Sequence, residues 1–229
     1  REAGLTPVRS ANDDPAAVLQ GFHPSVDWHQ LSEAVYAVRA GVPFFATNLD
    51  LTLPTERGFS LGNGSLVAAV VSATGVQPQS PGKPEPTMLH MAARFRQSER
   101  PLVVGDRLNT DLAGARAADI PGLIVLTGVS TARDVVLAIP QQRPSFIGAD
   151  LRCLLDRHDA PNRDGDWWRL RASAARVVDG ILELTTTTAT SDDAPDKLDP
   201  VRVAAAAVWA AVDAGETIDP NSVPDFEVT

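Results

Sequence analysis

The fold of this chain is decided by the stretch Pro101-Leu-Val-Val-Gly-Asp-Arg-Leu-Asn-Thr-Asp111. A short apolar run ends at Gly105, and Asp106 and Asp111 follow it, five positions apart, where a helix is expected to begin. Working outward, we expect strands at 101–105 and 122–127 and helices at 110–118 and 131–138. Such alternation is typical of a parallel sheet with helices on both faces. Asp106 would then lie at the carboxyl end of a strand, where open α/β sheets bind ligands.

A second signal lies upstream, at Gly82-Lys83-Pro84. Most lysines lie in solvent, but the neighbouring glycine and proline fix the backbone and favour a set position for Lys83. This is not a nucleotide-binding P-loop, because Pro84 occupies the Ser/Thr place, and Gly62-x-Gly64 is only a fragment of a dinucleotide fingerprint. A lysine and two carboxylates at the ends of α/β units suit chemistry on a phosphate. The carboxylates can hold Mg²⁺, and the lysine can balance the charge of the phosphoryl group. The simpler alternative for Asp106 is a helix cap.

Composition narrows the possible functions. The 229 residues carry a formal net charge of −9, which argues against nucleic acid or an anionic membrane as the main partner. Cys153 is the single cysteine, so disulfides within the chain and cysteine-based zinc sites are excluded. No apolar stretch approaches the ~20 residues of a membrane span, and no signal peptide is visible. We therefore expect a cytoplasmic protein that does not act at a membrane.

The character of the sequence changes after about Arg157. Asp179-Gly180 predicts a tight hairpin between two short strands. Asp199, followed by Pro200, is expected to cap an alanine-rich helix that ends near Gly215. We expect this tail to be a small α/β addition without chemistry of its own.

Four strings together resemble the haloacid dehalogenase superfamily of phosphatases over about residues 4–155. They are Phe44-Phe-Ala-Thr-Asn-Leu-Asp50, Gly82-Lys-Pro84, Val104-Gly-Asp-Arg-Leu-Asn-Thr-Asp111 and Leu126-Thr-Gly-Val129. The residues of these strings are similar to those of subclass IIA, which has a large α/β cap of type C2. They are most similar to those of the glycerol 3-phosphate phosphatases of actinobacteria.

The resemblance implies an α/β fold with a Rossmann-like parallel-sheet core, part of a C2 cap and a small C-terminal α/β extension. It also divides the chain into three regions. Residues 1–60 would be the C-terminal part of the cap, residues 61–157 the C-terminal part of the phosphatase core, and residues 158–229 the extension.

The resemblance also implies roles for individual residues. Lys83 matches the family's third motif, which steadies the phosphoryl group and the nucleophile. Asp106 matches the fourth motif, a direct Mg²⁺ ligand, and Asp111 matches its supporting acid. Asn48 and Asp50 lie at the end of the cap and are expected to contact substrate.

The family's nucleophile motif has a possible counterpart in Phe44–Thr52, but its first aspartate would be Asn48, which cannot attack phosphorus. On that interpretation the protein is a non-catalytic binding or regulatory protein built on a decayed phosphatase. The order of motifs favours the other interpretation, in which Asn48 and Asp50 belong to the segment returning from the cap. The nucleophilic aspartate would then lie upstream of Arg1, and this chain would neither fold nor act without that upstream fragment.

We therefore expect a Mg²⁺-dependent phosphatase that acts on a small phosphorylated metabolite through a phosphoaspartate. Glycerol 3-phosphate is the favoured substrate, and phosphoglycolate or a sugar phosphate is nearly as suitable.

Overall fold

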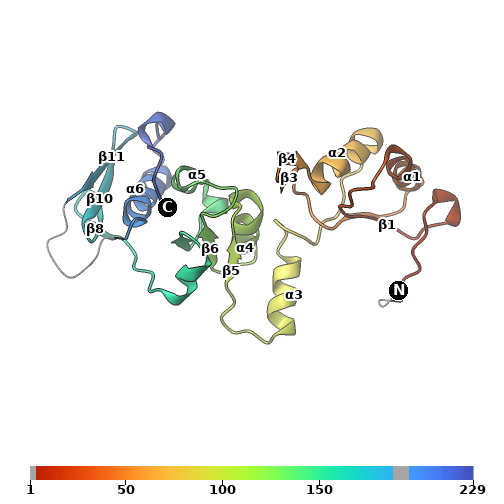
Figure 1. Cartoon of the computed structure of the whole chain (residues 1–229), viewed down its shortest axis with the longest axis horizontal. Helices are drawn as coiled ribbons and strands as arrows, with labels where there is room; N and C mark the ends of the chain where they lie inside the picture. The colour runs from red at the N-terminus through yellow and green to blue at the C-terminus, as the bar shows by residue number, and fades with distance from the viewer. Residues whose placement is uncertain (1–3, 188–195, 229) are drawn as a thin grey trace. The chain divides into compact units, whose positions relative to one another are not determined.

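The structure is a computed structural model and describes residues 4–187 and 196–228. The chain forms two compact units, Arg1–Ala92 and Ala93–Thr229, and each is described by itself (Figure 1). The expected boundaries after residues 60 and 157 concern functional domains, and they stay a prediction.

The first unit is built on two parallel strands, β1 (Val18–Gln20) and β2 (Phe44–Ala46), and Phe45 forms a further parallel bridge with Gln79. Helix α1 (Trp28–Arg39) connects the two strands and packs against α2 (Asn63–Thr74). Asp27 caps α1 through a capping box with Gln30, which satisfies donors that the helix start would otherwise leave unpaired. Between β2 and α2 lies the antiparallel hairpin of β3 (Thr52–Thr55) and β4 (Gly58–Leu61). The small core of this unit consists of Val38, Phe44, Ala46, Val67 and Val70.

The second unit begins with a parallel sheet in the order β5-β6-β7, formed by β5 (Val103–Gly105), β6 (Gly122–Val125) and β7 (Phe146–Gly148). All four residues of the central strand β6 are buried. A π-helical turn, Leu108–Leu112, leads from β5 into α4 (Ala113–Ala117), and α5 (Ala132–Val136) follows β6. The expected α/β fold with a parallel sheet is confirmed.

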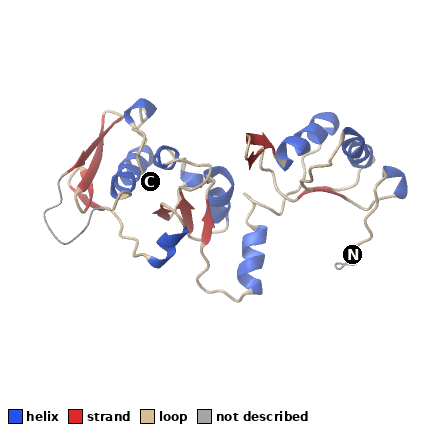
Figure 2. Ribbon diagram, viewed as in Figure 1, coloured by secondary structure: helices blue, strands red, loops and turns tan. Residues whose placement is uncertain are grey.

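The C-terminal part of this unit is an antiparallel sheet in the order β11-β10-β9-β8 with one long helix against it (Figure 2). The expected turn at Asp179-Gly180 joins β10 to β11, and both of its residues have positive φ, as a tight hairpin requires. The strands are β8 (Asn162–Asp164), β9 (Trp167–Leu170), β10 (Ser173–Val178) and β11 (Ile181–Thr186), and the helix is α6 (Asp199–Asp213). The remaining helix, α3 (Thr87–Phe95), spans the division between the two units.

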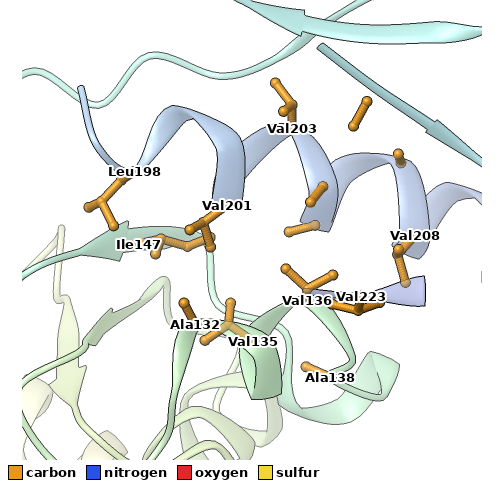
Figure 3. Packing of buried hydrophobic residues seen from close by; sticks show 14 of the residues in the cluster. Ala132, Val135, Val136, Ala138, Ile147, Leu198, Val201, Val203, Val208 and Val223 are labelled. Atoms are coloured by element: carbon orange, nitrogen blue, oxygen red, sulfur yellow. The ribbon is translucent and has the colours of Figure 1, made fainter. Parts of the chain in front are cut away.

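Helix α6 shares its core with the parallel sheet. Val201 and Val208 point toward α5 and β7, while Val203 points the other way, toward the strands of the antiparallel sheet (Figure 3). These three valines are almost completely buried, and one continuous core includes Ile124 of β6, Ile147 of β7 and the C-terminal addition.

The start of α6 corrects one expectation. Asp199 is not the cap of the helix, because Leu198 occupies the cap position and Asp199 is the first helical residue. Its carboxylate is 1% exposed and forms ion pairs with Arg171 at 2.8 Å and Arg202 at 3.1 Å. Arg202 also donates to the backbone oxygen of Ile147 in β7 at 3.1 Å. Asp199 thus connects α6 to Arg171, between β9 and β10, and Arg202 connects the helix to the parallel sheet through Ile147 O.

Within the described residues, no helix is both long enough and apolar enough to cross a membrane.

Candidate functional site

Asp106 follows β5 directly, as the sequence predicts, and its carboxylate is held in a defined place. The Oδ2 atom accepts a hydrogen bond from the backbone N–H of Val129 at 3.0 Å, and the backbone oxygen of Asp106 accepts one from Ser130 N at 3.0 Å. The space for this arrangement comes from Gly128, where a Cβ atom would lie 2.1 Å from Asp106 Oδ2. The Leu126–Val129 string is therefore needed next to Asp106, because any side chain at position 128 would displace the carboxylate. A carboxylate has about four lone-pair sites, so one amide contact leaves capacity for a cation.

Asp111 lies on the π-helical turn and is buried, with 6% of its surface exposed. Its Oδ2 atom accepts hydrogen bonds from the backbone N–H groups of Asp106 at 3.2 Å and Arg107 at 3.1 Å. Gly105 permits this close approach, since a Cβ there would lie 2.3 Å from the Cβ of Asp111. The structure thus brings Asp106 and Asp111 together, with Asp111 fixing the backbone that carries Asp106. Single π-turns are frequent where a side chain must be aimed at a functional site.

Lys83 lies in the first unit and is half-buried. Gly82 packs against the end of β2, where a Cβ would lie 2.2 Å from the backbone oxygen of Thr47. The backbone at the lysine is therefore fixed next to the segment that carries Asn48, as the flanking residues suggest. The Lys83–Pro84 peptide bond is cis.

Asn48 and Asp50 lie in the same unit, in a turn that follows β2. The side-chain oxygen of Asn48 accepts the backbone N–H of Asp50 at 3.3 Å, and both residues are half-buried. The Oδ1 atom of Asp50 is buried and has no hydrogen-bond partner among the described residues. The structure thus places Lys83, Asn48 and Asp50 in one unit and Asp106 and Asp111 in the other, and their union in one site stays a prediction.

Asn63 is a residue that the sequence did not single out. It is the first residue of α2, is only 2% exposed, and its Nδ2 atom donates to the backbone oxygen of Asn48 at 2.8 Å. The sequence offered one signal, the glycines on both sides of it, which are unusual at the start of a helix.

The acidic residues do not form an all-protein metal cage in the described part of the chain. In residues 4–187 and 196–228, no three His, Cys, Asp or Glu side chains gather as they do in an all-protein metal cage. Mg²⁺ does not need such a cage, because it keeps several waters and commonly binds one or two carboxylates together with a substrate phosphate. A single, well-placed carboxylate such as Asp106 fits that kind of site and does not fit a structural zinc or calcium site.

Comparison with known protein families gives a match that covers part of the chain. Residues 80–154 match the family model of HAD-hydrolase-like proteins. This segment includes Lys83, Asp106 and Asp111 and extends from the end of the first unit to the end of the parallel sheet.

Two relatives illustrate the similarity in sequence. The D-glycerol 3-phosphate phosphatase of Mycobacterium tuberculosis is 52% identical over 151 residues, which are 66% of this chain and 43% of the relative. The acid sugar phosphatase of Staphylococcus haemolyticus is 36% identical over 152 residues, 66% of this chain and 56% of the relative. The chain thus spans only about half the length of these relatives.

Two solved structures are similar in fold. A glycerol phosphate phosphatase from M. tuberculosis in complex with magnesium has a TM-score of 0.80 and 43% identity, over 92% of this chain and 61% of that one. A 4-nitrophenylphosphatase from Thermotoga maritima has a TM-score of 0.58 and 32% identity, over 62% of this chain and 55% of that one.

Proposed function

We propose, from the match of residues 80–154 to the HAD-hydrolase-like family model, that the chain is part of a Mg²⁺-dependent phosphatase for small phosphomonoesters. One observation carries the proposal. The Asp106 carboxylate is fixed at the end of β5 by the Val129 N–H, beside a glycine that leaves room for it. A carboxylate at this edge of a parallel sheet is suited to holding a cation next to a bound phosphate.

Each residue of the site has a proposed task. Asp106 holds Mg²⁺ through a carboxylate oxygen, and Asp111 keeps Asp106 in place through the backbone N–H groups of Asp106 and Arg107. Lys83 binds the phosphoryl oxygens by charge. Mg²⁺, when bound, supplies positive charge that offsets the charge developing on the phosphoryl group.

Asn48 and Asp50 are proposed to contact the alcohol part of the ester. They belong to the region expected to be the cap, residues 1–60, with residues 61–157 as the core and residues 158–229 as the extension. The Oδ1 atom of Asp50 supports this assignment only in having acceptor capacity to spare, because it is buried and has no hydrogen-bond partner among the described residues.

The nucleophile is proposed to come from a segment of the protein outside this chain. An aspartate there would attack phosphorus and form a phosphoaspartate, which water then hydrolyses. The relative from M. tuberculosis is a D-glycerol 3-phosphate phosphatase, so glycerol 3-phosphate is the favoured substrate. We place the reaction in the cytoplasm, as expected from the sequence.

The test is phosphate release from 4-nitrophenyl phosphate and a panel of small phosphomonoesters by the complete protein, with and without Mg²⁺. Asp106→Ala should lower kcat by about 10²–10³-fold, the usual cost of losing one group that stabilises the transition state. The matched control is Asp134→Ala. Thr131 caps α5, and Asp134 completes the capping box by accepting the Thr131 N–H at 2.8 Å, so its loss should reduce stability slightly and leave kcat unchanged.

Unchanged turnover in Asp106→Ala would end the assignment of Asp106. If the wild-type protein binds phosphomonoesters but hydrolyses none of them, the evidence would favour a binding protein on a decayed phosphatase fold.

A further inference from the structure

The turn formed by residues 48–51 lies across the first turn of helix α2. The backbone N–H of Gly62 donates to Leu51 O at 2.9 Å, and that of Gly64 donates to Asp50 O at 2.8 Å. The hydroxyl of Ser65 adds a hydrogen bond to Leu51 O at 2.7 Å. The second half of the turn is therefore held mainly by the helix backbone.

Glycine is needed for this close packing. A Cβ at Gly62 would lie 2.3 Å from Asp50 O, and a Cβ at Gly64 would lie 2.3 Å from Leu49 O. Such distances are far below van der Waals contact, so the turn and the helix can approach only where side chains are absent. The flanking glycines thus bring the 48–51 turn within reach of the one side chain between them.

That side chain is Asn63, and it holds the first half of the turn. Its Nδ2 atom donates to Asn48 O at 2.8 Å and lies 3.5 Å from Gln20 O, at the end of β1. Asparagine at a helix start usually turns outward to cap the helix, but here Gly62 is the cap residue and makes no side-chain cap hydrogen bond. The buried amide is therefore used on the turn instead of on its own helix.

The orientation of Asn48 is coupled to that of Asp50, two positions further along the chain. The Oδ1 atom of Asn48 accepts the backbone N–H of Asp50, so a shift of the Asn48 backbone moves both side chains. Recognition of a small alcohol depends on a few polar atoms held in advance, because a disordered turn has to be ordered by the substrate.

We propose that Asn63 is a positioning residue for recognition of the alcohol part of the substrate, an inference that rests on the proposed phosphatase function. Asn63 acts through Asn48: its amide fixes the turn that presents Asn48 and Asp50. Its side-chain hydrogen bonds go to the backbone oxygens of Asn48 and Gln20, within its own unit. Its loss therefore weakens binding of the ester and leaves binding of inorganic phosphate as it was.

The experiment measures kcat and KM for the preferred phosphomonoester, and the inhibition constant of inorganic phosphate, in the complete protein. Asn63→Ala and Asn63→Ser should raise KM about tenfold, the effect of one buried hydrogen bond. Their kcat should stay within about threefold, and the phosphate inhibition constant should not change. The control is Val70→Ala, on the same helix: Val70 is fully buried in the core and makes no hydrogen bond to the turn through its side chain. It should lower Tm and leave the ratio of KM to the phosphate inhibition constant unchanged.

If KM and the phosphate inhibition constant rise together, or if neither changes, Asn63 has only a structural role and the inference is overturned. If Asn63→Ala is too unstable to assay, Asn63→Ser decides, because serine is well tolerated at a helix start. A wild-type protein that hydrolyses no phosphomonoester would refute both the proposed function and this inference. Failure of the inference alone is recognised by an active wild-type protein.

Discussion

Two buried polar regions of this molecule are built in opposite ways. At the start of α6, the Asp199 carboxylate is paired with Arg171 and Arg202, and Arg202 also binds a backbone oxygen of β7. In the first unit, at the ends of β1 and β2, several buried polar atoms have no hydrogen-bond partner among the described residues. These are both side-chain polar atoms of Gln20, Asp50 Oδ1, Asn63 Oδ1 and Ser80 Oγ.

The difference separates buried polar groups that are paired within the chain from buried polar groups that still have unused hydrogen-bonding capacity. Leaving a buried polar atom without a partner is costly, so a chain rarely does so where stability is the only requirement. At the start of α6 the chain itself supplies the partners of the Asp199 carboxylate, Arg171 and Arg202. At the strand ends of the first unit it leaves acceptors and donors for water or a ligand.

The largest expected effect is a loss of stability on replacing Asp199 at the start of α6. Asp199→Asn removes the negative charge between two arginines whose side chains are only 21% and 10% exposed. The free energy of unfolding should fall by about 2–3 kcal/mol, because each arginine loses a buried partner, although Arg171 keeps Asp159 and Arg202 keeps Asp196. Denaturant unfolding followed by circular dichroism measures the loss. Glu183→Gln, which breaks the more exposed pair with Arg176, is the control and should cost less than about 1 kcal/mol.

A second substitution tests the strand end of the second unit. Gly128→Ala places a methyl group where Asp106 Oδ2 now lies. The carboxylate must move, and kcat/KM should fall about 10²-fold, the usual result of misplacing a group in an active site by about 1 Å. Unfolding is measured in parallel. An activity equal to wild type would show that the position of Asp106 does not matter for the reaction.

A smaller effect is expected at Gln20, whose side chain is buried without described partners. Gln20→Leu should leave the free energy of unfolding within about 1 kcal/mol of wild type, because replacing an unpaired polar group by an apolar one of similar size removes a desolvation cost. A loss of more than about 2 kcal/mol would contradict the comparison, since it would mean that the amide is well satisfied in solution.

The smallest effect is a dependence on pH at the α6 junction. Burial alone raises the pKa of Asp196, but hydrogen bonds from the Leu198 N–H and from Arg202 outweigh it, so the pKa is lowered in the folded state. A lowered carboxyl pKa contributes stability at neutral pH that is lost as the pH falls below about 4 and through the folded value. The Asp196 carboxylate is 41% exposed, so the contribution should stay below about 1 kcal/mol. The free energy of unfolding is measured at several pH values between about 7 and about 3. It should fall slightly less with falling pH in Asp196→Asn than in the wild type.

The parts of the fold that depend on neighbouring residues in sequence were predictable. The short apolar run before Gly105 predicts β5, and Asp179-Gly180 predicts the β10–β11 turn, and both are confirmed. The local sequence signal is strong in both places, although β5 is completed only by pairing with β6.

Features set by distant contacts were missed. Asp199 follows the pattern of a helix cap, but its arginine partners include Arg171, 28 positions away. Asn63 likewise resembles an ordinary helix start, and only the folded chain shows that Asn48 lies against it. The π-helical turn at Leu108–Leu112 was expected to be regular helix from residue 110, and it depends on Asp111 reaching back to the Asp106 and Arg107 amides.

The single thiol of this chain has a practical consequence. Cys153 is buried against Gly148, and burial raises the pKa of its thiol. A thiol of this kind reacts slowly with maleimides and oxidants. A cysteine introduced at exposed Arg57, at the tip of the β3–β4 hairpin, would then be the fast-reacting group, and one fluorescent dye attached there can report how the hairpin responds to added substrate.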